Sequence, residues 1–429
     1  MKKRTKLTRW HKLDNTANIF PVIANRKMSN VFRMTAILTE RVDGAVLQAA
    51  LEETVPYFAA FNVRLRHGLF WSYLETNRAT PHVQLEEDMP CSYINPIETD
   101  RFLFRVLYYK NRVHLETFHV LSDGTGALRF LKAICYSYCK RKMPEKFTPE
   151  ELETLYGIEN ADNIEDAYLK NYVPAPSKTF KETTAYHLHG YHRVLGDLDA
   201  ITALMPVEKL KAECRHHGVS IGAYLTALIG YAIYEEYQSG HGAKQPVNIF
   251  VLVDLRRVFK SETSLNFFSN IIIELPFSAP EISFETVLAQ VKKQFAEKLG
   301  KEELQQKLAF TVRSEMSLLA RVMPLPLKNG IMRIVYEHSN NGSTLPFSNL
   351  GNTNVEPPFK DLFEGFRFLM STTPKEPVKV SAIAYHGTLA LSFTSILEEN
   401  LMARNMVRRL TAAGIPVTIE SNGEPDEVL

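Results

Sequence analysis

Two blocks of alternating strand-like and helix-like segments are the main constraint on how this chain can fold. The first block holds strand-like runs such as VFRMTAILTE at 31–40 and helix-like runs such as 43–58. A polar stretch at 141–180, punctuated by four prolines, follows it, and the theme then repeats. This pattern predicts two mixed α/β halves joined by a crossover, which we place at 1–175 and 176–429.

Turn signals inside the apolar runs predict three hairpins, at His67–Gly68, Lys110–Asn111 and His386–Gly387. The longest uncharged run, Val219–Tyr234, has 16 residues. A membrane-spanning helix needs about 20 apolar residues. The run therefore predicts a buried helix, and we expect no transmembrane segment.

The charge balance argues against a nucleic-acid partner. The chain has 50 Lys and Arg against 48 Asp and Glu. Five basic residues crowd the first nine positions, but polar residues follow them where a signal peptide would have an apolar core. Four cysteines in 429 residues favour a reducing compartment. We therefore expect a cytoplasmic protein.

The stretch TFHVLSDGTG, Thr117–Gly126, lies where a strand-like run gives way to a helix-like run. Strand alternation places His119 on the face of Val113, at the strand's end. Asp123 falls at the start of the next helix, where it can act as an N-cap, and Gly124 permits a tight turn. The residues alone allow a core histidine beside a helix cap. They also allow a catalytic base, because an imidazole with a pKa of about 6.5 can accept a proton.

An H-x-x-x-D-G motif between a strand and a helix, in a chain of two α/β halves, resembles the chloramphenicol-acetyltransferase-like acyltransferases. This family includes alcohol O-acetyltransferases, condensation domains of peptide synthetases, wax ester synthases and the plant BAHD acyltransferases. The motif matches at His119, Asp123 and Gly124, while Phe118 stands where many members carry a second histidine. The resemblance implies two acyltransferase halves of mixed α/β structure with an active-site tunnel between them.

Two later stretches support the resemblance. LVDLRRVF at 252–259, followed by LNFFSN at 265–270, is similar to the Asp-x-Arg strand and nearby Asn of bacterial members. LPFSNLG at 345–351 is similar to the Ser-Asn-x-Gly strand of condensation-type chains. The BAHD signature DFGWG is absent, since LFEGF at 362–366 does not match it. The chain therefore most resembles the bacterial alcohol O-acetyltransferase branch.

The resemblance also implies roles for single residues. His119 would take the acceptor's proton as its oxygen attacks a thioester, without an acyl-enzyme intermediate. Asp123 would point away from the substrate and pair with Arg256, or as a second choice with Arg257. The oxyanion of the tetrahedral intermediate needs a hydrogen-bond donor. The candidate donors are Asn270, Ser348 and Asn349.

The implied reactants are an acyl-CoA, with acetyl-CoA first, and a small-molecule alcohol or amine as acceptor. Acyl-CoA would be a co-substrate, and no bound cofactor or metal is expected. One alternative is a condensation-type enzyme fed by the thioester of an acyl carrier protein. A second alternative is a non-catalytic relative that binds acyl ligands.

A serine hydrolase is a more distant alternative. GVSIG at 218–222 fits the G-x-S-x-G pattern, but a nucleophile elbow needs a strand before the serine. Residues 206–218 instead predict a helix that stops at a glycine, so that Ser220 caps the next helix.

Two clusters of histidine or cysteine lack the further ligands that a metal site needs. His187, His189 and His192 have no Asp, Glu or Cys beside them in sequence, and Cys135 and Cys139 lack a second pair nearby. Neither cluster predicts a metal site.

Overall fold

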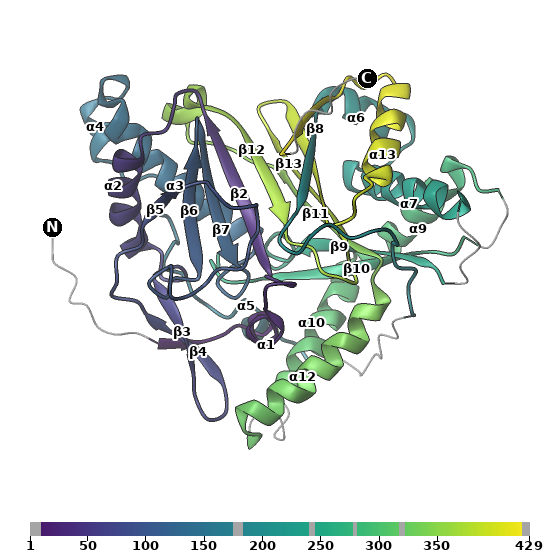
Figure 1. Ribbon diagram of the computed structural model, residues 1–429, viewed down its shortest axis with the longest axis horizontal. Coiled ribbons are helices and arrows are strands. Elements are labelled where there is room, and N and C mark those ends of the chain that lie inside the picture. The colour runs from purple at the N-terminus through teal and green to yellow at the C-terminus, as the bar shows by residue number, and fades with distance from the viewer. Residues whose placement is uncertain (1–9, 175–182, 240–244, 278–280, 317–321, 423–429) are drawn as a thin grey trace.

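The computed structural model describes residues 10–174, 183–239, 245–277, 281–316 and 322–422. Its strands form three sheets, and helices cover the two larger ones (Figure 1). Strands meet at each of the three predicted hairpin turns. The fold class predicted from the alternation, a mixed α/β protein, is confirmed.

The first sheet carries the strand that leads to His119. Its strands are β2 (Val31–Leu38), β5 (Val83–Leu85), β6 (Phe104–Tyr109), β7 (Arg112–Phe118) and β12 (Phe363–Met370). Their order is β12-β2-β7-β6-β5, and all neighbours are antiparallel except β5 and β6. All eight residues of β2 are buried, as expected of a central strand covered on both faces.

Strand β12 comes from the C-terminal part of the chain and completes this first sheet (Figure 1). Phe368 lies opposite Met34 of β2, and Met370 lies opposite Phe32. The sequence pattern did not predict a strand at residues 363–370. The division into two halves at residue 175 stays a prediction. Strand β12 comes from the second of these halves but belongs to the sheet of the first.

The second sheet belongs to the C-terminal part. Its strands are β8 (Asp199–Pro206), β9 (Val247–Asp254), β10 (Phe268–Leu275), β11 (Leu345–Asn352), β13 (Val378–Tyr385), β14 (Thr388–Ser395) and β15 (Thr418–Ser421). The order is β10-β9-β11-β13-β14-β8-β15, and β11 is parallel to both neighbours. Strands β9 and β11, which contain the start of the LVDLRRVF stretch and the LPFSNLG stretch, are thus adjacent.

Most of the predicted helices are present. The helices are α1 (Phe20–Ile23), α2 (Gly44–Thr54), α3 (Gly124–Lys142), α4 (Pro149–Glu153), α5 (Ala167–Lys170), α6 (Val207–His216), α7 (Ile221–Ser239), α8 (Arg256–Phe259), α9 (Phe284–Lys298), α10 (Lys301–Met316), α12 (Leu325–Ser339) and α13 (Leu401–Ala412). Helix α2 begins where the Asp43 carboxylate accepts from the N–H groups of Ala45 and Val46. Among the described residues, no helix combines the length and hydropathy needed to cross a membrane.

A small third sheet lies beside α12. It consists of β1 (Trp10–Lys12), β3 (Val63–His67) and β4 (Ser72–Thr76), in the order β1-β4-β3. The tip of the β3–β4 hairpin touches the start of α12, because Leu325 N donates to Leu69 O over 2.8 Å.

Two hydrophobic cores lie under the two larger sheets, and the crossover joins them. Phe61 and Phe130 belong to the first core, and Leu228 and Ile249 to the second. In the crossover, Tyr156 packs on the first core and Tyr168 is buried in the second. The end of the predicted crossover, residues 175–180, lies outside the described residues.

Candidate active site

His119 lies just beyond the end of β7, where the chain turns toward α3. Its N–H donates to Asn30 O over 3.0 Å, and Leu121 N donates to Phe118 O over 3.0 Å, which closes the turn. The side chain therefore lies at the rim of the first sheet, as strand alternation predicted. Three aromatic rings surround it, with centroid distances of 4.6, 5.1 and 5.4 Å to Phe20, Phe32 and Phe268.

Asn266 fixes which ring nitrogen of His119 carries the proton. Its Nδ2 donates to His119 O over 3.1 Å and to Asp14 Oδ2 over 2.9 Å, so its Oδ1 is the free acceptor. His119 Nδ1 lies 3.0 Å from that oxygen and must donate to it. The lone pair is then on Nε2, which makes no hydrogen bond to any residue that the structure describes.

The surroundings favour a neutral ring. Burial lowers the pKa of His119 below its usual value, and the positive charge of Lys379 acts in the same direction. The hydrogen bond with Asn266 and the charge of Asp123 oppose this shift without reversing it. At neutral pH the imidazole is therefore unprotonated at Nε2, which is the state that a general base requires.

Asp14 extends this hydrogen-bonded chain into the protein interior. Its buried carboxyl accepts from Ala17 N over 2.8 Å, and from Asn266 through both the backbone N–H and the side chain. Burial raises the pKa of Asp14 to about 7, against the effect of these hydrogen bonds. The chain Asp14–Asn266–His119 thus joins the N-terminal segment, β7 and the residues before β10.

Asp123 points away from the ring of His119 and into a buried ion pair. Its Oδ1 accepts from Gly126 N over 3.2 Å, which caps α3 as predicted. Its Oδ2 accepts from Arg256 Nη1 over 2.7 Å and from Phe267 N over 2.9 Å. Burial alone would raise the pKa of Asp123, but Arg256 and the two N–H groups hold it below its usual value. The contact expected between Asp123 and Arg256 is therefore present.

Arg256 also holds the loop that presents Asn266. Its Nε donates to Thr263 O over 3.0 Å, and its Nη2 donates to Leu265 O over 2.5 Å. Asp254 Oδ1 lies 3.2 Å from its Nη1. Arg257, the second choice as partner of Asp123, is exposed. Arg256 thus connects the start of α3 to the loop behind His119.

Close packing, more than turn conformation, explains the glycines after Asp123. Gly124 is the first residue of α3 and does not have a positive φ, so the expected tight-turn role is wrong. A Cβ there would lie 3.0 Å from Leu350 Cδ2, a flexible side-chain end. At Gly126 a Cβ would lie 2.6 Å from Ser264 O, a backbone atom, so Gly126 has the stricter requirement.

The three candidate oxyanion donors lie in two places. Asn270 Oδ1 lies 3.2 Å from Lys307 Nζ, and the asparagine of LNFFSN that contacts His119 is Asn266. Ser348 and Asn349 lie in the middle of β11. The next residue of that strand, Leu350, packs on Gly124. Their roles as oxyanion donors stay predictions.

Comparison with solved structures gives matches over almost the whole chain. TRI101 of F. sporotrichioides, complexed with coenzyme A and T-2, matches with a TM-score of 0.63 and 12% identity, covering 97% of this chain and 100% of that one. The wax ester synthase/diacylglycerol acyltransferase of Marinobacter aquaeolei VT8 matches at 0.56 and 13%, covering 94% and 100%. The first condensation domain of the CDA synthetase matches at 0.56 and 13%, covering 94% and 96%.

The chain has the fold of the chloramphenicol-acetyltransferase-like acyltransferases and condensation domains. Comparison with protein-family models and with curated proteins gives no match. At 12–13% identity, the structural likeness establishes the fold alone.

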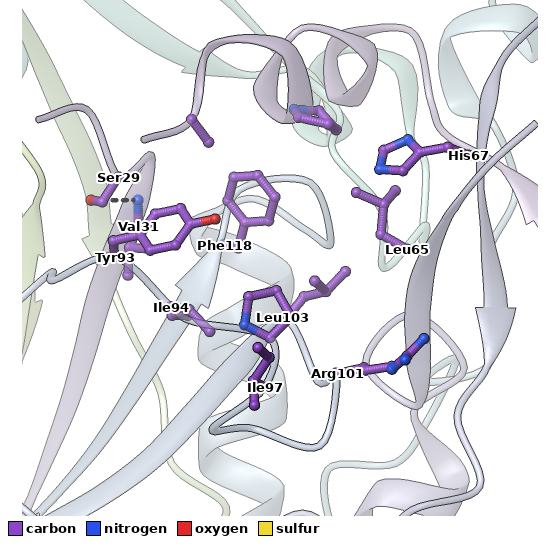
Figure 2. A pocket seen from close by; sticks show the side chains of 13 residues that line it. Ser29, Val31, Leu65, His67, Tyr93, Ile94, Ile97, Arg101, Leu103 and Phe118 are labelled. Carbon is purple, nitrogen blue, oxygen red and sulfur yellow. Dashed lines mark hydrogen bonds between the residues drawn. The ribbon is translucent and has the colours of Figure 1, made fainter. Parts of the chain in front are cut away.

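A cavity of about 390 Å³ is lined by Phe118, the residue that precedes His119. Figure 2 shows Phe118, Leu65, Leu103 and the two isoleucines of the 93–103 segment around it. His119 is not among its lining residues, but Pro21 is, and the neighbouring Phe20 stacks on the His119 ring. The predicted tunnel between the halves stays a prediction.

The remaining sequence signals have structural explanations. Helix α6 precedes Ser220, and Ser220 Oγ accepts from Ala223 N over 3.2 Å, so GVSIG is a helix cap and not a nucleophile elbow. His187 Nδ1 lies 3.0 Å from Lys375 O. Within the described ranges, no group of three or more His, Cys, Asp or Glu residues could hold a metal ion. Cys135 and Cys139 are buried in α3.

Asn266 and Asp14 are the site residues that sequence reasoning missed. Asn266 lies inside LNFFSN, which holds two asparagines, and the sequence prediction names the other one, Asn270. No local motif marks Asp14 as a site residue, because its partner in the site, Asn266, lies 252 residues away. A buried aspartate can be found only once the fold brings its partners to it.

Proposed function

We propose that this protein is an acyl-CoA-dependent O-acyltransferase, similar to alcohol acetyltransferases, with His119 as its general base. The observation that carries the proposal is the unprotonated Nε2 of His119, whose state follows from its hydrogen bond to Asn266. The relatedness of the fold to wax ester synthase and to condensation domains supports acyl transfer as the reaction class.

The chemistry follows from this nitrogen. The acceptor hydroxyl gives its proton to His119 Nε2 while its oxygen forms a bond to the thioester carbonyl carbon. The tetrahedral intermediate then collapses, the C–S bond breaks, and the imidazolium returns the proton to the departing thiolate. The products are an ester and free CoA. Asp123 takes no part in proton transfer, because Arg256 holds it on the other side of the loop.

The cavity beside Phe118 is our proposed place for an apolar part of a substrate. Its wall is largely aliphatic and aromatic, with Ser29, His67, Tyr93 and Arg101 as polar members. Pockets of this volume are large enough for small organic ligands.

The test measures release of CoA thiol by the full-length protein. Acetyl-CoA and longer acyl-CoAs are each offered with a panel of alcohols and amines, and mass spectrometry identifies the product. We expect ester formation with at least one alcohol, and a loss of roughly 10²–10⁴-fold in His119→Ala. His216→Ala is the matched control, because His216 is exposed at the end of α6.

Two results would contradict the proposal. One is equal ester formation by His119→Ala, folded as judged by circular dichroism, and by the wild type. The other is no product from any acyl-CoA while an acyl-loaded carrier protein gives product, which would move the protein to the condensation class.

A further inference from the structure

Exposed apolar side chains gather where the third sheet meets α12. Trp10 of β1 is 63% exposed, and Leu69 at the hairpin tip is 69% exposed. Trp71 and Leu327 are also exposed. The two elements touch here, since Lys328 Nζ donates to Phe70 O over 2.7 Å, and Figure 1 shows the hairpin and the start of α12 at the same end of the molecule. We call this region, with the outer face of α12, the tip surface.

Helix α12 continues the tip surface along its outer face. Ile331, Ile334 and Val335 are exposed and follow Leu327 at helical spacings of four, seven and eight. The other face packs on α1, where Arg333 Nη2 donates to Val22 O over 2.9 Å. A stripe of large aliphatic side chains on a surface helix marks an interaction site, because monomeric proteins seldom expose such patches.

Charge adds a second, independent observation. Within the described residues, β1, the hairpin 63–76 and α12 contain five Lys and Arg residues against two acids, while the whole chain has a net charge of +2. Both acids are already paired. Glu75 binds Arg64 and Arg66, and Glu337 binds Lys375 over 3.0 Å. The apolar tip surface is therefore bordered by positive charge.

We propose that the tip surface docks on the interface of a bilayer that carries anionic lipids. Tryptophan prefers the headgroup level of a bilayer, and both tryptophans of the chain lie here. Lys12 Nζ lies 5.1 Å from the Trp71 ring centroid, so that a cation stands next to an interfacial aromatic ring. An amphipathic helix such as α12 lies in the plane of the interface and does not span the membrane.

The aliphatic side chains decide between rival partners. Nucleic acid would use the cations and stack bases on the two tryptophans, but it offers nothing to Leu69, Leu327 or Ile334. A bilayer accommodates the aliphatic, the aromatic and the basic groups together. This proposal goes beyond the proposed acyl transfer and does not depend on it.

The two tryptophans make a direct test available. Because the chain has no other tryptophan, its indole emission reports on the tip surface alone. The full-length protein is titrated with vesicles of phosphatidylcholine plus phosphatidylglycerol, and with phosphatidylcholine alone. We expect a blue shift and quenching by brominated acyl chains with the anionic vesicles, weakened by salt. Vesicle flotation gives the bound fraction.

Substitutions locate the contact. Leu69→Asp and Ile334→Asp should each weaken binding by roughly tenfold or more, since each removes a buried apolar side chain from the bound state. Leu195→Asp is the matched control, because Leu195 is 63% exposed and lies in the loop before β8, outside the third sheet and α12. Circular dichroism checks that each variant is folded.

Three outcomes would overturn the proposal. They are an unchanged emission spectrum with anionic vesicles, equal binding to neutral and anionic vesicles, and equal losses in Leu195→Asp and Leu69→Asp. An emission change with nucleic acid or an acidic soluble protein, in the absence of any response to vesicles, would assign the surface to that partner instead.

Discussion

Arg256 reaches from α8 to the start of α3 and places its Nη1 2.7 Å from Asp123 Oδ2, across 133 residues of sequence. Both side chains are buried. Removing either partner leaves the other charge buried and unpaired, which costs about 3–5 kcal/mol of the free energy of unfolding. The pair is thus a structural support for the loop that carries His119.

The first prediction concerns this pair. Asp123→Asn and Arg256→Met should each lower the free energy of unfolding by about 3–5 kcal/mol. The double variant should lose less than the sum, with a coupling of about 0.5–3 kcal/mol, because the two residues are in contact. Urea unfolding of the four proteins measures this. Arg257→Met is the control, since that neighbour is exposed. Full additivity would exclude the pair as a stabilising contact.

The second prediction concerns Asn266. In Asn266→Ala the ring of His119 loses the partner that holds its proton on Nδ1, and a bond that raises its pKa. The pH profile of kcat/KM should therefore have a lower plateau and an acidic limb shifted to lower pH. Asn352→Ala, an exposed asparagine of β11, should leave both unchanged. A lower plateau without a shift of the limb would mean that Asn266 acts only through folding.

The third prediction concerns pH and stability. Burial raises the pKa of Asp14 to about 7 from its ordinary value of 3.8, so the folded state favours its protonated form. This contribution is fully present below pH 3.8 and is lost as pH rises toward 7, at about 1.4 kcal/mol per pH unit. Between pH 5 and 7 the wild type should lose roughly 2–3 kcal/mol more stability than Asp14→Asn. An equal loss of unfolding free energy by both proteins between pH 5 and 7 would refute the prediction.

The fourth prediction separates direct transfer from covalent catalysis. Ser220→Ala should remain active, because Ser220 caps α7 and does not stand on an elbow. Its stability should fall by about 1 kcal/mol through loss of the cap. Initial rates with both substrates varied should give intersecting double-reciprocal lines. Parallel lines together with an acylated Ser220 found by mass spectrometry would move the protein to the hydrolase class.

The local elements were predictable wherever short-range chemistry decides them. Asp43 and Asp123 are N-caps, and the turns after His67 and Lys110 join strands, because each depends on residues a few positions apart. The partner of Asp123 could be named only through the resemblance. Distance in sequence hides such a contact from any local pattern.

The rest depended on the fold. Asn266 and Asn270 are equally good candidates in the sequence, and only the register of β10 and the loop before it decides which one meets His119. Strand β12 was missed because FEGFRFLM contains a glycine and two charges, and its role as a strand comes from pairing with β2.

The pairing of β12 with β2 also sets an order of events during synthesis. The edge of β2 that faces β12 stays unpaired until residues 363–370 have left the ribosome. At translation rates of about 5–20 residues per second, the interval between β7 and β12 lasts roughly 10–50 s. Throughout that time a nascent chain displays a strand edge open to other chains. A fragment ending near residue 175 would keep that edge permanently, so the N-terminal half is expected to aggregate when it is expressed alone.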